Sequence, residues 1–190
     1  MSLIATDSLT YSLIDTVKLC ELLKQANETG DLHNNVQNQL TVRYLLRMTA
    51  FIDTSDITGN QQLMNVCSTM MNNIYLPELL IEPVLSAWWR GSGLSVIDCV
   101  GKIIEISQNI HHTNGSTEEE EEEIKILTSI RSMLLIEWAI QKVTGKKQSN
   151  PTDLFASVSN YLLENLQQPI IELRGLAIRC IGLLTLYSTR

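Results

Sequence analysis

One segment constrains the fold of this chain more than any other. It runs from Gln168 to Leu184 and reads QPIIELRGLAIRCIGLL. Pro169 suits a helix start, because its fixed φ fits the first turn and the N–H that it lacks has no partner there in any helix. Apolar residues then recur at steps of three and four, which predicts one buried face made of Ile170, Leu173, Ala177, Cys180, Ile181 and Leu184. Two small residues, Ala177 and Gly182, fall where a neighbouring helix would need to come close.

The order of residues in this segment resembles the second helix of a HEAT repeat, with proline, an apolar pair, Arg174, alanine and a late glycine. Such a helix cannot bury its apolar face alone and stacks on units of the same kind. The chain has 190 residues, which is room for about four helical hairpins. We therefore expect an all-α fold, an α-solenoid (α-α superhelix) of about four HEAT-like hairpins that spans residues 1–190 as a single segment.

The composition agrees with an aliphatic helical protein. Hydrophobic residues make up 44% of the chain, aromatic residues only 5%, and four prolines and nine glycines interrupt them. No stretch approaches the length of unbroken apolar sequence that spans a membrane, and no secretion signal is visible. The cysteines lie far apart within apolar helical patterns, which predicts buried reduced thiols and no metal or cofactor site: Cys20, Cys67, Cys99 and Cys180.

Caps, helix breakers and apolar spacing predict eight helices that pair into four hairpins. They are expected at about 8–26, 36–52, from Asp56 or Thr58 to 72, 77–91, 94–110, from the glutamate run to 143, from about 150, and from Pro169. In the second helix, the predicted apolar stripe consists of Leu40, Tyr44, Leu45, Met48 and Phe51.

The formal net charge of −7 comes from one place. Six consecutive glutamates, Glu118 to Glu123, account for nearly all of the excess, and the rest of the chain is close to neutral. Residues 111–123 are polar and highly charged, which predicts a disordered acidic insertion. The remaining balance is not basic enough to indicate DNA binding by itself.

A catalytic function is not indicated. The three histidines are His33, His111 and His112, and none lies in a recognisable nucleophile motif. No glycine-rich phosphate loop is present. Asp53 and Asp56 are more typical of helix capping than of a metal pair. We therefore expect a protein that is not an enzyme.

A longer stretch, from Tyr44 to Val84, resembles a known family. It contains an apolar-Asp-x-x-Asp turn at Ile52–Asp56, followed by a helix start at Gly59, and then a Leu/Met-rich helix from Leu63 to Met71. The motif Leu/Pro-Glu-x-Leu-Ile-x-Pro follows at Leu76–Pro83. Together with the helix from Glu172 to Leu183, these pieces resemble CAP-G, the HEAT-repeat subunit of condensin, as a fragment or short form.

The resemblance implies a non-catalytic function without cofactors or small-molecule substrates. CAP-G-like subunits bind a segment of the kleisin subunit along the solenoid. Together the two proteins form a basic groove that holds duplex DNA during mitotic chromosome condensation. The ATPase sites of condensin lie in other subunits. The expected location is the nucleus and chromosomes, with a cytoplasmic pool and no membrane association.

Two small sets of residues are candidates for these contacts. Lys142, Lys146 and Lys147 form the only basic cluster, and Arg131 lies two to three turns earlier on the same predicted helix. These four are the predicted DNA contacts, although cations at a helix C-terminus also stabilise the helix. Trp88 and Trp89 are the predicted partner contacts, because only one of two adjacent helical residues can point fully inward. Burial of both between repeats is the alternative.

A second class of function stays open at this point. The chain could be a protein-only α-solenoid scaffold or transport adaptor. The Tyr44–Pro83 resemblance favours the condensin-type function. A continuous positive stripe that includes Lys142 and Lys147 would favour DNA binding, and a neutral or acidic groove would favour the scaffold.

Overall fold

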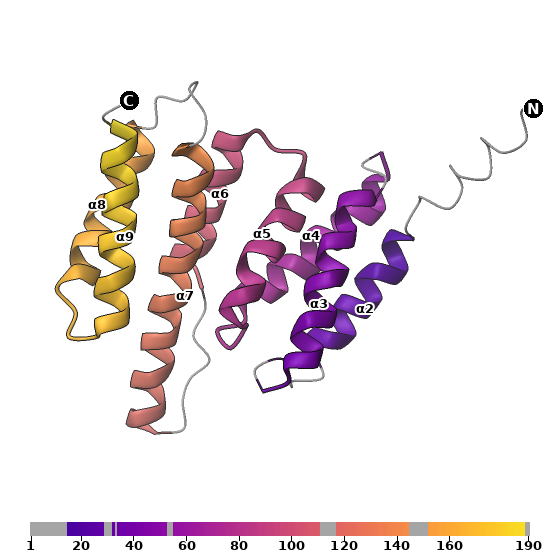
Figure 1. Ribbon diagram of the computed structural model, residues 1–190, viewed down its shortest axis with the longest axis horizontal. Helices are drawn as coiled ribbons and strands as arrows, with labels where there is room; N and C mark the ends of the chain where they lie inside the picture. The colour runs from indigo at the N-terminus through magenta and orange to yellow at the C-terminus, as the bar shows by residue number, and fades with distance from the viewer. Residues whose placement is uncertain are drawn as a thin grey trace, which may run out of the picture. The chain divides into compact units, whose positions relative to one another are not determined.

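The computed structural model describes residues 15–28, 32, 34–52, 55–110, 117–144 and 152–188. Within these ranges the structure is all-helical, with eight α-helices, one 3-10 turn and no strand, which confirms the all-α part of the predicted fold (Figure 1). The elements are α2 (Thr16–Glu28), α3 (Val36–Met48), η1 (Thr49–Phe51), α4 (Ile57–Asn72), α5 (Glu78–Ser92), α6 (Val96–Gln108), α7 (Glu118–Thr144), α8 (Thr152–Leu166) and α9 (Ile171–Ser188).

The helices form two compact units, which divide after Gly93. Unit 1 covers residues 1–93 and unit 2 covers residues 94–190. Gly93 ends α5 with a φ of 62°, a left-handed conformation that glycine adopts without strain.

Unit 1 consists of two helical hairpins packed in two layers. The most extensive contact is between α4 and α5, the helices of the second hairpin. The first helices, α2 and α4, pack against each other, and the second helices, α3 and α5, do the same (Figure 1). The fully buried side chains of this core are aliphatic and sulfur-containing: Leu23, Val42, Leu46, Leu63, Met70, Met71, Leu80, Val84 and Leu85.

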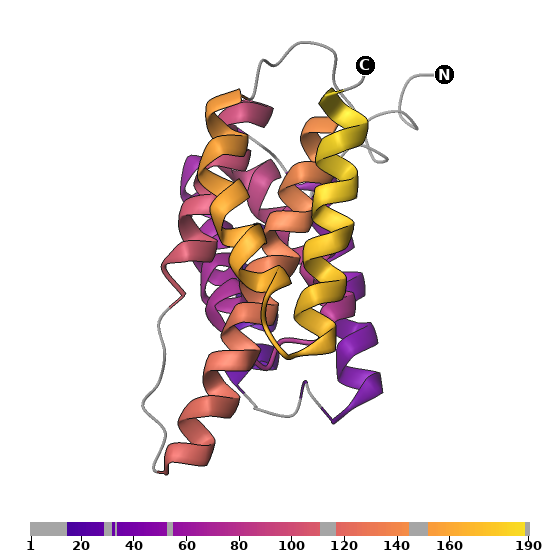
Figure 2. The same cartoon turned by 90° about the vertical axis from the view of Figure 1, so that its left-hand side faces the viewer.

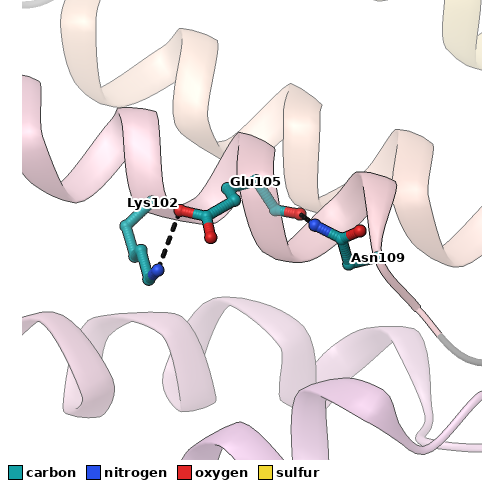
Figure 3. A network of polar contacts seen from close by, with 3 residues as sticks. All are labelled: Lys102, Glu105 and Asn109. Carbon is teal, nitrogen blue, oxygen red and sulfur yellow. Dashed lines mark hydrogen bonds and ion pairs between the residues drawn. The ribbon is translucent and has the colours of Figure 1, made fainter.

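Unit 2 has the same hairpin plan. Helix α6 packs against α7, α8 packs against α9, and the two hairpins meet mainly through α7 and α9 (Figure 2). Its core is again aliphatic, with buried Ile103, Met133, Leu135, Ile136, Ala139, Ile140, Leu162, Leu173 and Ala177. On the solvent side of α6, Lys102 Nζ lies 2.8 Å from Glu105 Oε2, and the Asn109 amide donates to the Glu105 carbonyl at 2.8 Å (Figure 3).

Side-chain caps fix the starts of the helices where the sequence predicts them. Asp56 Oδ1 accepts the N–H of Gly59 at 2.9 Å at the start of α4, which confirms Asp56 as the cap. Ser95 Oγ accepts the N–H of Asp98 at 3.2 Å at the start of α6. Each cap satisfies an amide group that has no partner within its own helix.

The prediction of a disordered insertion at 111–123 is wrong for Glu118–Glu123. Residues 111–116 lie outside the described residues, whereas Glu118–Glu123 form the first turns of α7. Glutamate is a good helix former, and negative charge is favoured at a helix N-terminus, so the run begins the helix instead of breaking it. Both views show these turns extending past the turn that joins α8 and α9 (Figures 1 and 2).

The predicted apolar stripe of α3 is also wrong as a buried face. Leu40, Tyr44, Met48 and, in η1, Phe51 are exposed, and Leu45 is half-buried. The buried face consists instead of Gln39, Val42, Leu46 and Thr49. Its polar members can be buried because they are hydrogen-bonded: the Gln39 amide donates to the Leu32 carbonyl at 2.7 Å, and the Thr49 hydroxyl donates to the Leu46 carbonyl at 2.6 Å.

The predicted buried face of α9 is confirmed at its centre. Leu173, Ala177 and Cys180 are buried, and Ile170, Ile181 and Leu184 are half-buried. Gly182 differs from the prediction, because it is exposed and a Cβ added there would have no heavy atom within 4 Å. Close helix approach in α9 therefore occurs at Ala177 and not at Gly182.

Candidate protein- and nucleic-acid-binding residues

The two adjacent tryptophans of α5 have different surroundings. Trp88 is buried in unit 1, with 3% of its surface exposed, and its indole N–H donates to Ser68 Oγ on α4 at 3.0 Å. Trp89 is half-buried. Trp88 therefore packs within the hairpin of α4 and α5, and its ring is not available to a partner. The predicted partner contact is left to Trp89.

Two of the predicted DNA contacts, Arg131 and Lys142, lie within the described residues and have different surroundings. Arg131 is only 4% exposed, so its guanidinium is not presented to a phosphate, because its position on α7 faces inward. Lys142 is half-buried, and its Nζ lies 5.0 Å from the centroid of the Trp138 ring, a cation–π contact. Lys146 and Lys147 lie outside the described residues. Of the two described candidates, Lys142 is therefore the one whose side chain is partly exposed.

Arg179, for which the sequence predicts no contact, joins the two hairpins of unit 2. Arg179 on α9 binds Glu137 on α7 through two parallel bonds, Nε to Oε1 at 3.0 Å and a terminal nitrogen to Oε2 at 3.1 Å. Arg174, the arginine of the HEAT-like segment, is exposed and makes no ion pair with the residues that the structure describes. The partner of Arg179 is 42 residues away, so no local spacing in the sequence indicates the pair.

The cysteines are buried and reduced, as predicted. Burial raises the pKa of Cys20 to about 11 and that of Cys99 and Cys180 to about 12, and it raises the pKa of Cys67 further. A thiol with such a pKa stays protonated near neutral pH and is a poor nucleophile. No group of three or more His, Cys, Asp or Glu side chains in the described part of the chain is arranged to hold a metal ion.

Each unit has an open groove among its described residues. In unit 2, a groove of about 630 Å³ lies between the N-terminal half of α7 and the start of α9. Its exposed rim carries Glu118, Glu121 and Glu122 against one lysine, Lys125, and its apolar lining residues include Ile124, Ile170 and Leu173. The groove of unit 1, about 460 Å³, lies between α2 and α4 and is lined by mixed polar and apolar side chains. An acidic rim repels phosphates, so the unit 2 groove does not favour DNA.

Among the helices of the described residues, none has the length and apolar character needed to cross a bilayer. No protein-family model matches the chain, and no curated protein or solved structure shows significant similarity to it. The resemblance to CAP-G therefore rests on the quoted sequence motifs alone.

Proposed function

We propose that this chain is a HEAT-repeat segment of a condensin subunit similar to CAP-G. In this proposal it binds the kleisin subunit and, jointly with it, duplex DNA during mitotic chromosome condensation. It acts without catalysis and without a cofactor, on chromosomes in the nucleus and with a cytoplasmic pool. The hairpins are successive turns of an α-solenoid.

The pairing of helices in the two units is the observation that carries the proposal. In unit 1, first helices pack on first helices and second helices on second helices, the layering that stacked helical repeats require. In unit 2, the two hairpins join through their second helices, α7 and α9. A chain with this plan buries its apolar faces between neighbouring repeats.

Two of the motifs that resemble CAP-G lie at the starts of helices α4 and α5. Asp56 caps α4, and Gly59 follows at the third helical position, where a Cβ would collide with the Asp56 carboxylate and with Thr16 of α2. Pro77 immediately precedes α5, whose Leu80 and Ile81 are buried. The motif residues thus cap and pack the hairpin of α4 and α5, which explains why those residue types occur at that spacing.

DNA contact in this proposal depends on the kleisin. Lys142 and the neighbouring Lys146 and Lys147 supply only part of a basic groove, so the kleisin has to add further positive charge. Phosphate contacts of this kind are independent of sequence and weaken as salt increases. Arg131 is left out of the proposed contacts because it is buried.

The protein-only scaffold is the second candidate, and two observations favour it. Arg131 is buried, and the groove of unit 2 has an acidic rim. A scaffold of this kind would bind a protein partner and leave DNA unbound under all conditions.

The test measures binding of a fluorescent DNA duplex by the chain, alone and with a condensin kleisin fragment, over a series of salt concentrations. We expect binding only when the kleisin is present, with affinity that falls as salt rises. Lys142→Gln should weaken this binding and lower the salt slope by about 1. The matched control is Lys102→Gln, an exposed lysine of α6 that is paired with Glu105.

Three outcomes divide the candidates. Joint binding that Lys142→Gln weakens and Lys102→Gln does not supports the condensin-type function. Kleisin binding with no DNA binding at low salt supports a segment that only holds the kleisin. Failure to bind the kleisin removes the condensin proposal and leaves the scaffold.

A further inference from the structure

One face of α3 carries large apolar side chains that the fold leaves uncovered. We name these residues the α3 stripe: Val36, Leu40, Tyr44, Met48 and Phe51. Their exposed fractions are 67%, 42%, 64%, 41% and 67%. Successive members are three or four residues apart, so the side chains lie in one row along the helix.

The α3 stripe lies opposite the face by which α3 joins unit 1. Gln39, Val42, Leu46 and Thr49 are buried and occupy the other side of the helix. The helix therefore buries two polar side chains while it leaves two aromatic rings in water. A continuous exposed apolar row of this kind, in place of scattered single residues, marks an interaction surface.

The charges that α3 itself carries have one sign. Helix α3 contains Arg43 and Arg47 and no acidic residue, in a chain whose net charge is −7. Both arginines lie on the same edge of the row, because they are four residues apart and occupy positions i−1 and i+3 relative to Tyr44. Arg47 is exposed and Arg43 is half-buried. A partner that covers the row meets positive charge along one edge.

We propose that the α3 stripe binds an amphipathic helix of a partner protein, with an apolar face against the stripe and Asp or Glu side chains along the edge that meets Arg43 and Arg47. The row from Val36 to Phe51 is about 20 Å long, the length of about four helical turns. Two helices pack by placing such rows into each other's grooves. This inference is independent of the kleisin and DNA binding proposed above.

A second copy of the chain fits the surface less well. Pairing of two α3 stripes brings arginines from both copies into one interface, and α3 has no acidic residue to neutralise them. Like charges placed opposite one another oppose association. Charge complementarity therefore favours an acidic partner over self-association.

The test uses three synthetic peptides of about 20 residues, long enough to form a helix on binding. The first has leucines at helical spacing with glutamates along one edge. The second has lysines in place of those glutamates, and the third has the composition of the first in an order without helical amphipathicity. Binding to the whole chain is followed by fluorescence anisotropy. We expect the glutamate-edged peptide to bind more tightly than the other two.

The variants locate the binding surface. Leu40→Ser with Tyr44→Ser should weaken binding of the glutamate-edged peptide at least tenfold, in line with the loss of central apolar contacts. Arg47→Glu should weaken it and should improve binding of the lysine-edged peptide. The matched control is Ile178→Ser on α9, which removes an apolar side chain that is 61% exposed. Thermal unfolding of each variant confirms that it is folded.

Several results would overturn the proposal. They are absence of binding, equal binding of the glutamate-edged and lysine-edged peptides, and an equal effect of the control variant. Sedimentation velocity tests for self-association. If the chain self-associates and Leu40→Ser with Tyr44→Ser abolishes this, the α3 stripe binds a second copy. Loss of duplex DNA binding in the same variant would assign it to nucleic acid.

Discussion

Helices α3 and α9 are both rich in apolar residues, yet they use their apolar faces differently. In α9, the face that apolar spacing predicts is the face that is buried, with Leu173, Ala177 and Cys180 at its centre. In α3, the predicted face is the exposed one, and Gln39 and Thr49 take part in the burial.

The difference arises because apolar spacing reports how many apolar side chains share a face and not what covers that face. In α9 the buried row of Leu173, Ala177 and Cys180 is the predicted one, although Ile171, Ile178 and Leu186 on other sides of the helix are exposed. Helix α3 has a longer apolar row outside than inside. Its inner polar groups are buried at low cost, because Gln39 bonds the Leu32 carbonyl and Thr49 bonds both the Leu46 carbonyl and Arg90.

The largest effect should separate the two faces of α3 directly. Leu46 is 1% exposed and Leu40 is 42% exposed. Leu46→Ala should lower the free energy of unfolding by about 2–5 kcal/mol, since it leaves a cavity in the core. Leu40→Ala should change it by less than about 1 kcal/mol. Urea denaturation of the two variants measures both values, and equal losses would mean that the outer face of α3 is covered.

The sequence is sufficient for most of the fold, and particular residues show why. Asp56 predicts the start of α4, and Pro77 and Pro169 lie just before α5 and α9, because capping and proline geometry are local properties. The high charge of Glu118–Glu123 predicts a disordered insertion. In the structure these residues are helical, because negative charge is favoured at a helix N-terminus.

The candidate site is less predictable from sequence because it depends on distant contacts. Adjacent tryptophans predict unequal exposure, but only the position of Ser68 on α4 determines that Trp88 is the buried one. Likewise, Arg131 and Lys142 are three turns apart on one helix, and tertiary packing alone decides that the first is buried and the second is not.

The second prediction concerns the buried polar groups that make the inner face of α3 possible. Thr49 is fully buried, donates to the Leu46 carbonyl and accepts a bond from Arg90 at 2.9 Å. Thr49→Val keeps the shape and removes both bonds, so it should cost about 1–2 kcal/mol. Thr185→Val on the exposed side of α9 is the control and should stay within about 0.5 kcal/mol. A similar cost for both variants in urea denaturation would show that burial does not distinguish these hydroxyl groups.

The third prediction uses the pKa of a thiol on the buried face of α9. Burial raises the pKa of Cys180 to about 12, whereas an unfolded thiol ionises near pH 8.5. Between these values the unfolded chain has released its proton and the native chain has not, so the native state becomes less stable as pH rises. Cys180 should contribute a loss of about 1.4 kcal/mol per pH unit in that window.

The measurement is the free energy of unfolding from pH 8 to 11, in the original chain and in Cys180→Ala. This range covers the pH at which the thiol of the unfolded chain ionises. The variant should lose stability less steeply. Ile178→Cys places a thiol on the exposed face of the same helix, where it should leave the slope unchanged. If Cys180→Ala leaves the slope unchanged as well, the native thiol at position 180 is not held in its protonated form.

The smallest effect tests whether the outer face of α9 is as open as that of α3. Glycine within a helix costs about 0.5–1 kcal/mol relative to alanine, and a Cβ at Gly182 would meet nothing within 4 Å. Gly182→Ala should therefore raise the free energy of unfolding by up to that amount. At Gly91 of α5, a Cβ would lie 3.3 Å from the Asn60 carbonyl oxygen, so Gly91→Ala should gain less or lose stability. If urea denaturation shows that Gly182→Ala is destabilising, a neighbouring element covers α9 at Gly182, and the outer faces of α9 and α3 are not equally open.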